Sequence, residues 1–150
     1  MKKIYLDVCS LCRPFDNQDY ARISLETDAV NLILSGVRNS KYRLMKSPVH
    51  FSEIYAIKDI FERNELLRLL EYYGESFNPD QSSKKILKTR TEELISKQFG
   101  VADAAHVAFS EYYGSVFITC DDKLLVLCGK NNISVDCQNP VIFSEKENLK

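Results

Sequence analysis

Four acidic side chains that lie far apart in the sequence each stand where a predicted strand ends or a predicted helix begins. Asp7 and Asp121 each directly follow a short apolar run, which is the pattern of a buried strand. In a parallel α/β sheet, ligand sites form at the carboxyl edge, where residues in these positions meet. Carboxylates gathered there repel one another unless a hard cation lies among them. The sequence therefore predicts a divalent-metal site formed by Asp7, Glu53, Asp103 and Asp121.

Such a site suits the hydrolysis of a phosphodiester bond, which needs an activated water and neutralisation of charge on the phosphoryl oxygens. One or two hard cations held by carboxylates supply both. Mg²⁺ is typically bound through a few carboxylates and keeps several of its waters, so four acids are ample. We expect Asp7 and Asp103 to bind the metal directly, and Asp121 and Glu53 to bind it directly or through water.

Three further residues are candidates for this site, and each also has an ordinary structural explanation. Asp122 could add a fifth carboxylate, although a residue that opens a helix often serves as its cap. Thr119 could hydrogen-bond to the Asp7 carboxylate and hold its rotamer, as residues around metal ligands often do. The alternative is a half-buried strand threonine. Arg13 lies in the predicted loop after Asp7 and could contact a substrate phosphate.

The histidine and cysteine residues are expected to be structural. His106 lies one turn after Asp103 on a predicted helix, where a packed histidine is the expected role and substrate contact the alternative. Cys9 and Cys12 form a Cys-x-x-Cys pair, but no second Cys or His pair follows at the short spacing that zinc sites use. The predicted metal site therefore uses oxygen ligands alone.

Short apolar runs alternate with segments of helical periodicity along most of the chain. Strands are predicted at residues 4–6, 42–45, 115–119 and 133–135, and helices at 20–37, 48–60, 62–75, 81–99, 103–113 and 122–128. A loop is expected at residues 9–19, and a loose tail at about 140–150. This alternation favours an α/β fold with a mainly parallel sheet flanked by helices, in one domain over residues 1–150.

The composition is that of an ordinary globular protein, with 45% apolar and 27% charged residues. The net charge of −1 gives no general attraction to nucleic acid, so such a partner would need a local basic patch. One candidate patch lies on a predicted helix and consists of Lys84, Lys85, Lys88 and Arg90. No apolar run approaches the roughly 18 residues of a membrane span. The odd number of cysteines, five, suits reduced thiols, and a cytoplasmic location is expected.

Several segments, taken together, resemble conserved parts of the PIN-domain family. The opening of such proteins is similar to Ile4 to Cys9, Arg13 to Asp16 and Arg22 to Glu26. Two downstream motifs of the family are similar to Asp103 to Ala108 and Phe117 to Leu125. The motifs are individually short, but they occur in the family's order and spacing and cover most of the chain.

The resemblance implies a three-layer α/β/α fold and a Mg²⁺- or Mn²⁺-dependent nuclease site. Many PIN-domain proteins are ribonucleases, and many are the toxin of a toxin–antitoxin pair. RNA as substrate and an antitoxin protein as partner are therefore expectations from the resemblance. A catalytically inactive PIN-like module that binds RNA or protein is the alternative.

The resemblance also assigns a role to each of the four acids. Asp7 matches the first acidic residue of the family and Asp103 the third. Asp121 matches the fourth, because it stands two residues after Thr119 in a Thr-x-Asp pattern. Glu53 matches the second, in a segment that varies within the family. Two other acids compete for this position if the alignment shifts, namely Glu62 and Glu65.

Two further expectations concern the first helix and the leucine-rich segment. Arg22 and Glu26 are four residues apart, which is the usual spacing of an ion pair on a helix surface. The resemblance to the PIN-domain family includes this segment, so Glu26 could instead point toward the acidic site. The apolar residues from Leu66 to Tyr73 could cover a homodimer or antitoxin contact, or could be buried in the core of the chain itself.

Overall fold

A five-stranded sheet forms the centre of the protein, and the computed structural model describes all residues from 1 to 150. The strands lie in the order β3-β2-β1-β4-β5, and every neighbouring pair is parallel. In the central strand, Ile4 pairs with Leu44 on one side and with Val116 on the other. The strands are β1 (Lys2–Leu6), β2 (Tyr42–Met45), β3 (Gly74–Glu75), β4 (Val116–Ile118) and β5 (Cys137–Gln138).

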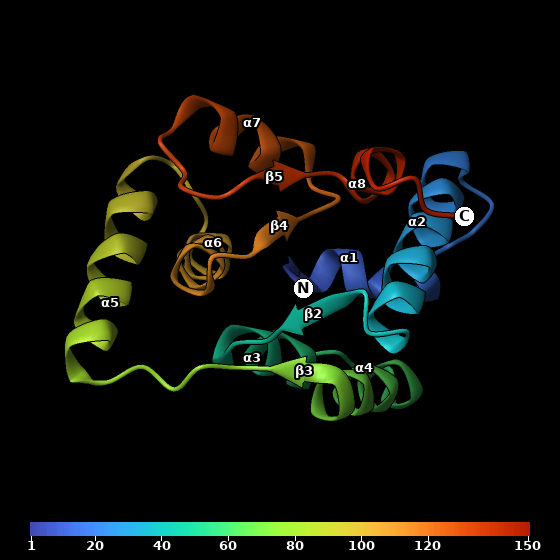
Figure 1. Cartoon of the computed structure of the whole chain (residues 1–150), viewed down its shortest axis with the longest axis horizontal. Helices are drawn as coiled ribbons and strands as arrows, with labels where there is room; N and C mark the ends of the chain where they lie inside the picture. The colour runs from blue at the N-terminus through green and yellow to red at the C-terminus, as the bar shows by residue number, and fades with distance from the viewer.

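Helices flank this sheet on both faces, as Figure 1 shows. The helical elements are α1 (Val8–Cys12), the 3₁₀ turn η1 (Arg13–Phe15), α2 (Ala21–Arg38), α3 (Pro48–Tyr55), α4 (Ile60–Tyr73), α5 (Gln81–Ser96), α6 (Val101–Tyr113), α7 (Asp122–Lys130) and α8 (Pro140–Lys146). The predicted three-layer α/β/α fold with a parallel central sheet is confirmed. None of the helices combines the length and the apolar character needed to cross a membrane.

Two hydrophobic cores lie on opposite faces of the sheet because alternate strand residues point to opposite sides. On one face, Ile4 and Leu6 pack in a core to which α2, α4 and α8 contribute. On the other face, Tyr5 packs in a core to which α5, α6 and α7 contribute. The parallel arrangement places the carboxyl ends of all five strands along one edge of the sheet.

Several helix boundaries follow the predicted signals. Pro48 opens α3 after the N-cap residue Ser47, as expected. The predicted single helix at 48–60 is wrong, because α3 ends at Tyr55 and the carboxylate of Asp59 accepts the N–H of Glu62 to cap a new helix, α4. The predicted loop at 9–19 is also wrong in part, because α1 begins directly after its cap Asp7 and η1 follows it.

The last part of the chain differs most from the sequence prediction. The strand expected at 133–135 begins later, at Cys137, because β4 pairs with the carbonyl groups of Asp136 and Gln138. The tail expected to be loose contains α8, which lies beside α2 in Figure 1 and buries Phe143. Asn139 caps α8 by accepting the N–H of Val141.

Candidate metal centre at the carboxyl edge of the sheet

Asp7 stands at the carboxyl end of the central strand and is 4% exposed. Its Oδ1 accepts the backbone N–H of Ser10, which caps α1, and the Cys9 thiol lies 3.1 and 3.3 Å from its two oxygens. Burial raises the pKa of this carboxyl, while the nearby Thr119 hydroxyl and the Cys9 thiol lower it. The carboxylate is therefore held rigidly in a place where its charge is poorly solvated.

The other three predicted acids act electrostatically on the same region. Asp103 stands in the first turn of α6, and burial raises the pKa of its carboxyl. The negative charges of Asp7, Asp121 and Glu53 raise it further. The fold therefore brings the four predicted acids within electrostatic reach of one another, although they come from four different parts of the chain. In the present arrangement, no three Asp, Glu, His or Cys side chains stand together as a ready-made ligand set.

Asp121 and Thr119 shape the end of β4. The Asp121 carboxylate accepts the N–H of Leu124 and caps α7, while its own N–H donates to the Thr119 hydroxyl at 3.1 Å. Thr119 is fully buried, and its hydroxyl lies 3.6 Å from the Cys9 sulfur. Thr119 thus connects the end of β4 to the residues around Asp7.

A buried chain of hydrogen bonds, which the sequence did not predict, leads to Glu53. His106 Nε2 pairs with the Glu53 carboxylate, and its Nδ1 lies 2.6 Å from the Tyr5 hydroxyl. The Tyr5 hydroxyl in turn lies 2.6 Å from the Ser47 hydroxyl. His106 is packed and structural, as expected, and it also holds Glu53 in place. In the sequence, the one sign of this chain of hydrogen bonds was Tyr5, whose hydroxyl is the only polar side-chain group in the apolar run of β1.

His50 connects α3 to the strand that carries Asp7. Its Nδ1 accepts the backbone N–H of Ser47, and its Nε2 lies 2.7 Å from the carbonyl oxygen of Leu6. An accepting Nδ1 leaves Nε2 as the protonated donor, so the ring is neutral. Burial, together with the charge of His106, lowers the pKa of His50 to about 3.

Acidification is expected to destabilise the protein through His50. Because its folded-state pKa lies below the ordinary value of 6.5, the unfolded chain binds the proton more readily between pH 6.5 and about 3. Relative to a His50→Gln variant, wild type should lose about 2–3 kcal/mol of unfolding free energy between pH 7 and pH 4.5. Urea denaturation at pH 7 and pH 4.5 measures the unfolding free energy of both proteins. If the difference in unfolding free energy between wild type and His50→Gln were the same at both pH values, the prediction would be contradicted.

Asp122 lies apart from the four acids. Arg22 binds its two oxygens at 2.6 and 2.8 Å and also donates to the carbonyl of Cys120. The candidate role of Asp122 as the cap of α7 is wrong, since Asp121 is the cap. Its candidate role as a fifth metal ligand stays a prediction, and in this structure its carboxylate is bound by Arg22. The pair instead ties α2 to the turn that carries Asp121.

Arg13 and Glu26 are also engaged elsewhere. The Arg13 guanidinium pairs with Glu26 at 3.0 Å and with Asp16 at 2.8 Å, and its contact with a substrate phosphate stays a prediction. Glu26 is 1% exposed and also accepts the amide of Asn139 at 2.6 Å. It anchors η1 and the start of α8 to α2, and none of these contacts is with one of the four acids.

The remaining candidates are distributed over the surface and the core. Glu65 pairs with Arg68 on the surface. Burial, together with the interaction with Glu62, raises the pKa of the Cys12 thiol to about 12. Of the three glutamates considered for the second acidic position, Glu53 is the one whose charge acts on Asp103. In the leucine-rich segment, Leu66 and Leu70 are buried core residues and Tyr72 is exposed.

Two solved structures share this fold. A chain in the crystal structure of FitAcB from Neisseria gonorrhoeae matches with a TM-score of 0.52 and 17% identity, over 91% of this protein and 97% of that chain. A chain in the structure of FitAB bound to an IR36 DNA fragment matches with a TM-score of 0.55 and 18% identity, over 92% of this protein and 95% of that chain. No protein-family model and no curated protein matches the sequence. The matches, nearly complete in both directions, support the three-layer α/β/α fold.

Proposed function

We propose that this protein is a metal-dependent endoribonuclease that hydrolyses phosphodiester bonds at the carboxyl edge of its sheet. The observation that carries the proposal is the electrostatic convergence on Asp103, whose pKa is raised by burial and, in addition, by the charges of Asp7, Asp121 and Glu53. Carboxylates that repel one another at the edge where α/β sheets bind ligands are typical of sites for hard cations.

The donor set fits Mg²⁺ or Mn²⁺ in kind and in charge. All four side chains offer carboxylate oxygens, which these ions prefer. Asp7 and Asp103 would bind the ion directly, with Asp121 and Glu53 binding directly or through water. When bound, the ion would supply an activated water and charge neutralisation on the phosphate. The protein itself contributes rigidity, since Cys9 and Ser10 hold Asp7 and His106 holds Glu53.

The test compares two aspartates that differ in their partners. Asp103→Asn is expected to abolish cleavage of a single-stranded RNA in Mn²⁺, because it removes a ligand from the acidic group. Asp122→Asn is the matched control and should cleave nearly as well as wild type, because its carboxylate is bound to Arg22. Equal activity of the Asp103→Asn variant and wild type would refute the proposal, as would cleavage by wild type in EDTA.

An inactive PIN-like binding module is the second candidate. It is favoured by the fact that no three potential ligands stand in a ready-made metal arrangement. Titration with Mn²⁺, followed by thermal unfolding, separates the two candidates. A metal-dependent rise in melting temperature supports the nuclease, whereas the absence of both stabilisation and cleavage supports the module.

We also propose that the protein is a cytoplasmic toxin with an antitoxin protein as partner. The support is its resemblance to PIN-domain proteins together with the fold that it shares with a chain of FitAcB and of FitAB. Expression in a bacterial host should then arrest growth, and the Asp103→Asn variant should not. Normal growth with active enzyme would argue against a toxin.

A further inference from the structure

A cavity of about 740 Å³ is lined by aromatic and basic side chains. Its walls come from the segments after β2 and β3 and from α3, α5 and α6. Four aromatic side chains line it, namely Phe51, Phe77, Phe109 and Tyr113, together with Lys46 and Lys84. None of its twelve lining residues is acidic, although the chain as a whole has a net charge of −1. The cavity is thus a local cationic site in a nearly neutral protein.

The aromatic rings of the cavity form a connected group. Tyr113 lies 5.8 Å from Phe77 and 5.9 Å from Phe109, measured between ring centroids. Phe77 is 40% exposed and therefore offers part of its ring to a ligand. The Lys3 ammonium lies 5.3 Å from the centroid of the same Phe77 ring. The Arg43 guanidinium lies over that ring at 5.7 Å and is paired with Glu75. Aromatic rings flanked by cations are what proteins use to hold unpaired bases of single-stranded nucleic acids.

The cavity and the acidic site share two helices and one hydrogen-bonded chain. On α3, Phe51 lines the cavity and Glu53 belongs to the acidic site. On α6, Asp103 and Phe109 are six residues apart, or about 9 Å along the helix axis. Ser47, in the cavity wall, bonds to the Tyr5 hydroxyl that leads through His106 to Glu53. Ser47 and Glu53 are therefore linked through three successive hydrogen bonds.

We propose that this cavity binds a base of single-stranded RNA next to the bond that is cut, with Phe77 stacking on the base and Lys84 contacting a phosphate. The inference rests on the proposed ribonuclease function and adds a binding subsite to it. The all-cationic charge of the lining favours a polyanion over a peptide. The subsite explains how a protein without overall positive charge holds RNA near its acidic centre.

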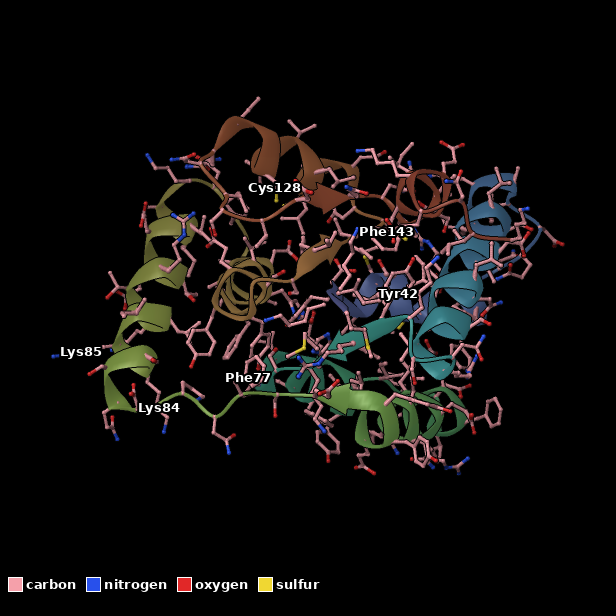
Figure 2. All side chains as sticks on the ribbon, viewed as in Figure 1. Tyr42, Phe77, Lys84, Lys85, Cys128 and Phe143 are labelled. Carbon is pink, nitrogen blue, oxygen red and sulfur yellow. The ribbon has the colours of Figure 1, made fainter.

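Neighbouring side chains provide matched controls. Figure 2 shows Phe77 on the extended segment between β3 and α5, Lys84 near the start of α5, and Lys85 extending outward from the same turn. Lys84 lines the cavity, whereas Lys85 lines a separate groove between α5 and α6. Tyr72 is an exposed aromatic residue of α4 outside the cavity. Phe77→Leu and Lys84→Gln therefore test the subsite, with Tyr72→Leu and Lys85→Gln as controls.

The experiment measures binding of a short single-stranded RNA containing 2-aminopurine, whose fluorescence falls when the base stacks. In EDTA, Phe77→Leu should weaken binding by on the order of tenfold and abolish the fluorescence change. Lys84→Gln should weaken binding several-fold. It should also reduce the slope of the logarithm of the binding constant against the logarithm of salt concentration by about 0.7. Both control variants should bind like wild type.

The outcomes separate this inference from the proposed function. RNA binding that is insensitive to Phe77→Leu and Lys84→Gln would overturn the subsite even if wild type cleaves RNA in Mn²⁺, and would leave the cavity to another ligand such as a protein segment. Stacking that depends on Phe77, in a protein that cleaves nothing, would support the subsite and refute the nuclease.

Discussion

Replacing Asp7 by Asn is expected to lower RNA cleavage by on the order of 10³-fold, equivalent to roughly 4 kcal/mol of transition-state stabilisation. Asp7 is the most buried of the four acids, and it is fixed by contacts with Cys9 and Ser10. An amide in its place keeps the shape of the side chain but loses the negative charge that attracts a divalent cation. The proposed metal centre should fail while the fold around it stays intact.

The same substitution is expected to leave metal-free protein at least as stable as wild type at neutral pH. Burial raises the pKa of Asp7, so its ionised form costs folding free energy that a neutral amide does not. Asn is also as good an N-cap as Asp, so it can still accept the N–H of Ser10. Loss of activity would therefore not result from unfolding.

Two measurements check this prediction. Cleavage of labelled RNA in Mn²⁺ gives the activity, and thermal unfolding with and without Mn²⁺ gives the stability and the metal response. Wild type should be stabilised by the ion in proportion to its occupancy, and the variant should not. A variant that retains cleavage, or that is stabilised by Mn²⁺ as strongly as wild type, would contradict a metal role for Asp7.

Replacing Phe143 by Ala is expected to lower the free energy of unfolding by about 3–5 kcal/mol. Phe143 is 1% exposed in the core between α8, α2 and the sheet, and its ring lies 5.5 Å from that of Tyr42. Truncation leaves a cavity in addition to the loss of buried apolar surface. The melting temperature should fall by roughly 10 °C.

The adjacent residue Ile142 provides the control for this prediction. Its side chain is 45% exposed on the same helix, so Ile142→Ala should change stability by less than about 1 kcal/mol. Urea denaturation of both variants gives the comparison. Equal stability of Phe143→Ala and wild type would show that α8 does not contribute to the core.

The architecture was predictable because its signals are local and repeated. Short apolar runs at β1, β2 and β4 alternate with helical periodicity, and Ser47 with Pro48 marked the start of α3. The short elements β3, β5 and α8 have no comparable pattern in the sequence. β3 and β5 are two residues long and depend on their neighbours for pairing, and α8 is stable because it packs on α2 and places Phe143 in the core.

The four acids could be found in the sequence, but their surroundings could not. Position at the end of an apolar run or at the start of a helix is a local property, and it indicated Asp7, Asp103 and Asp121. Whether a charged residue is free depends on partners far away in the sequence. The capture of Asp122 by Arg22 and the contact between His106 and Glu53 both result from the tertiary fold.

The order of the strands determines when such a site can exist during synthesis. β1 is made first, yet its neighbour β4 is made more than a hundred residues later, and the backbone N–H of Asp7 bonds to Ile118 at 3.1 Å. Pairings between distant segments form slowly and only after both segments are available. A growing chain therefore carries Asp7 without Asp121 until more than a hundred further residues have been made. The acidic site that we propose cuts RNA therefore cannot be complete before β4 and Asp121 have been made.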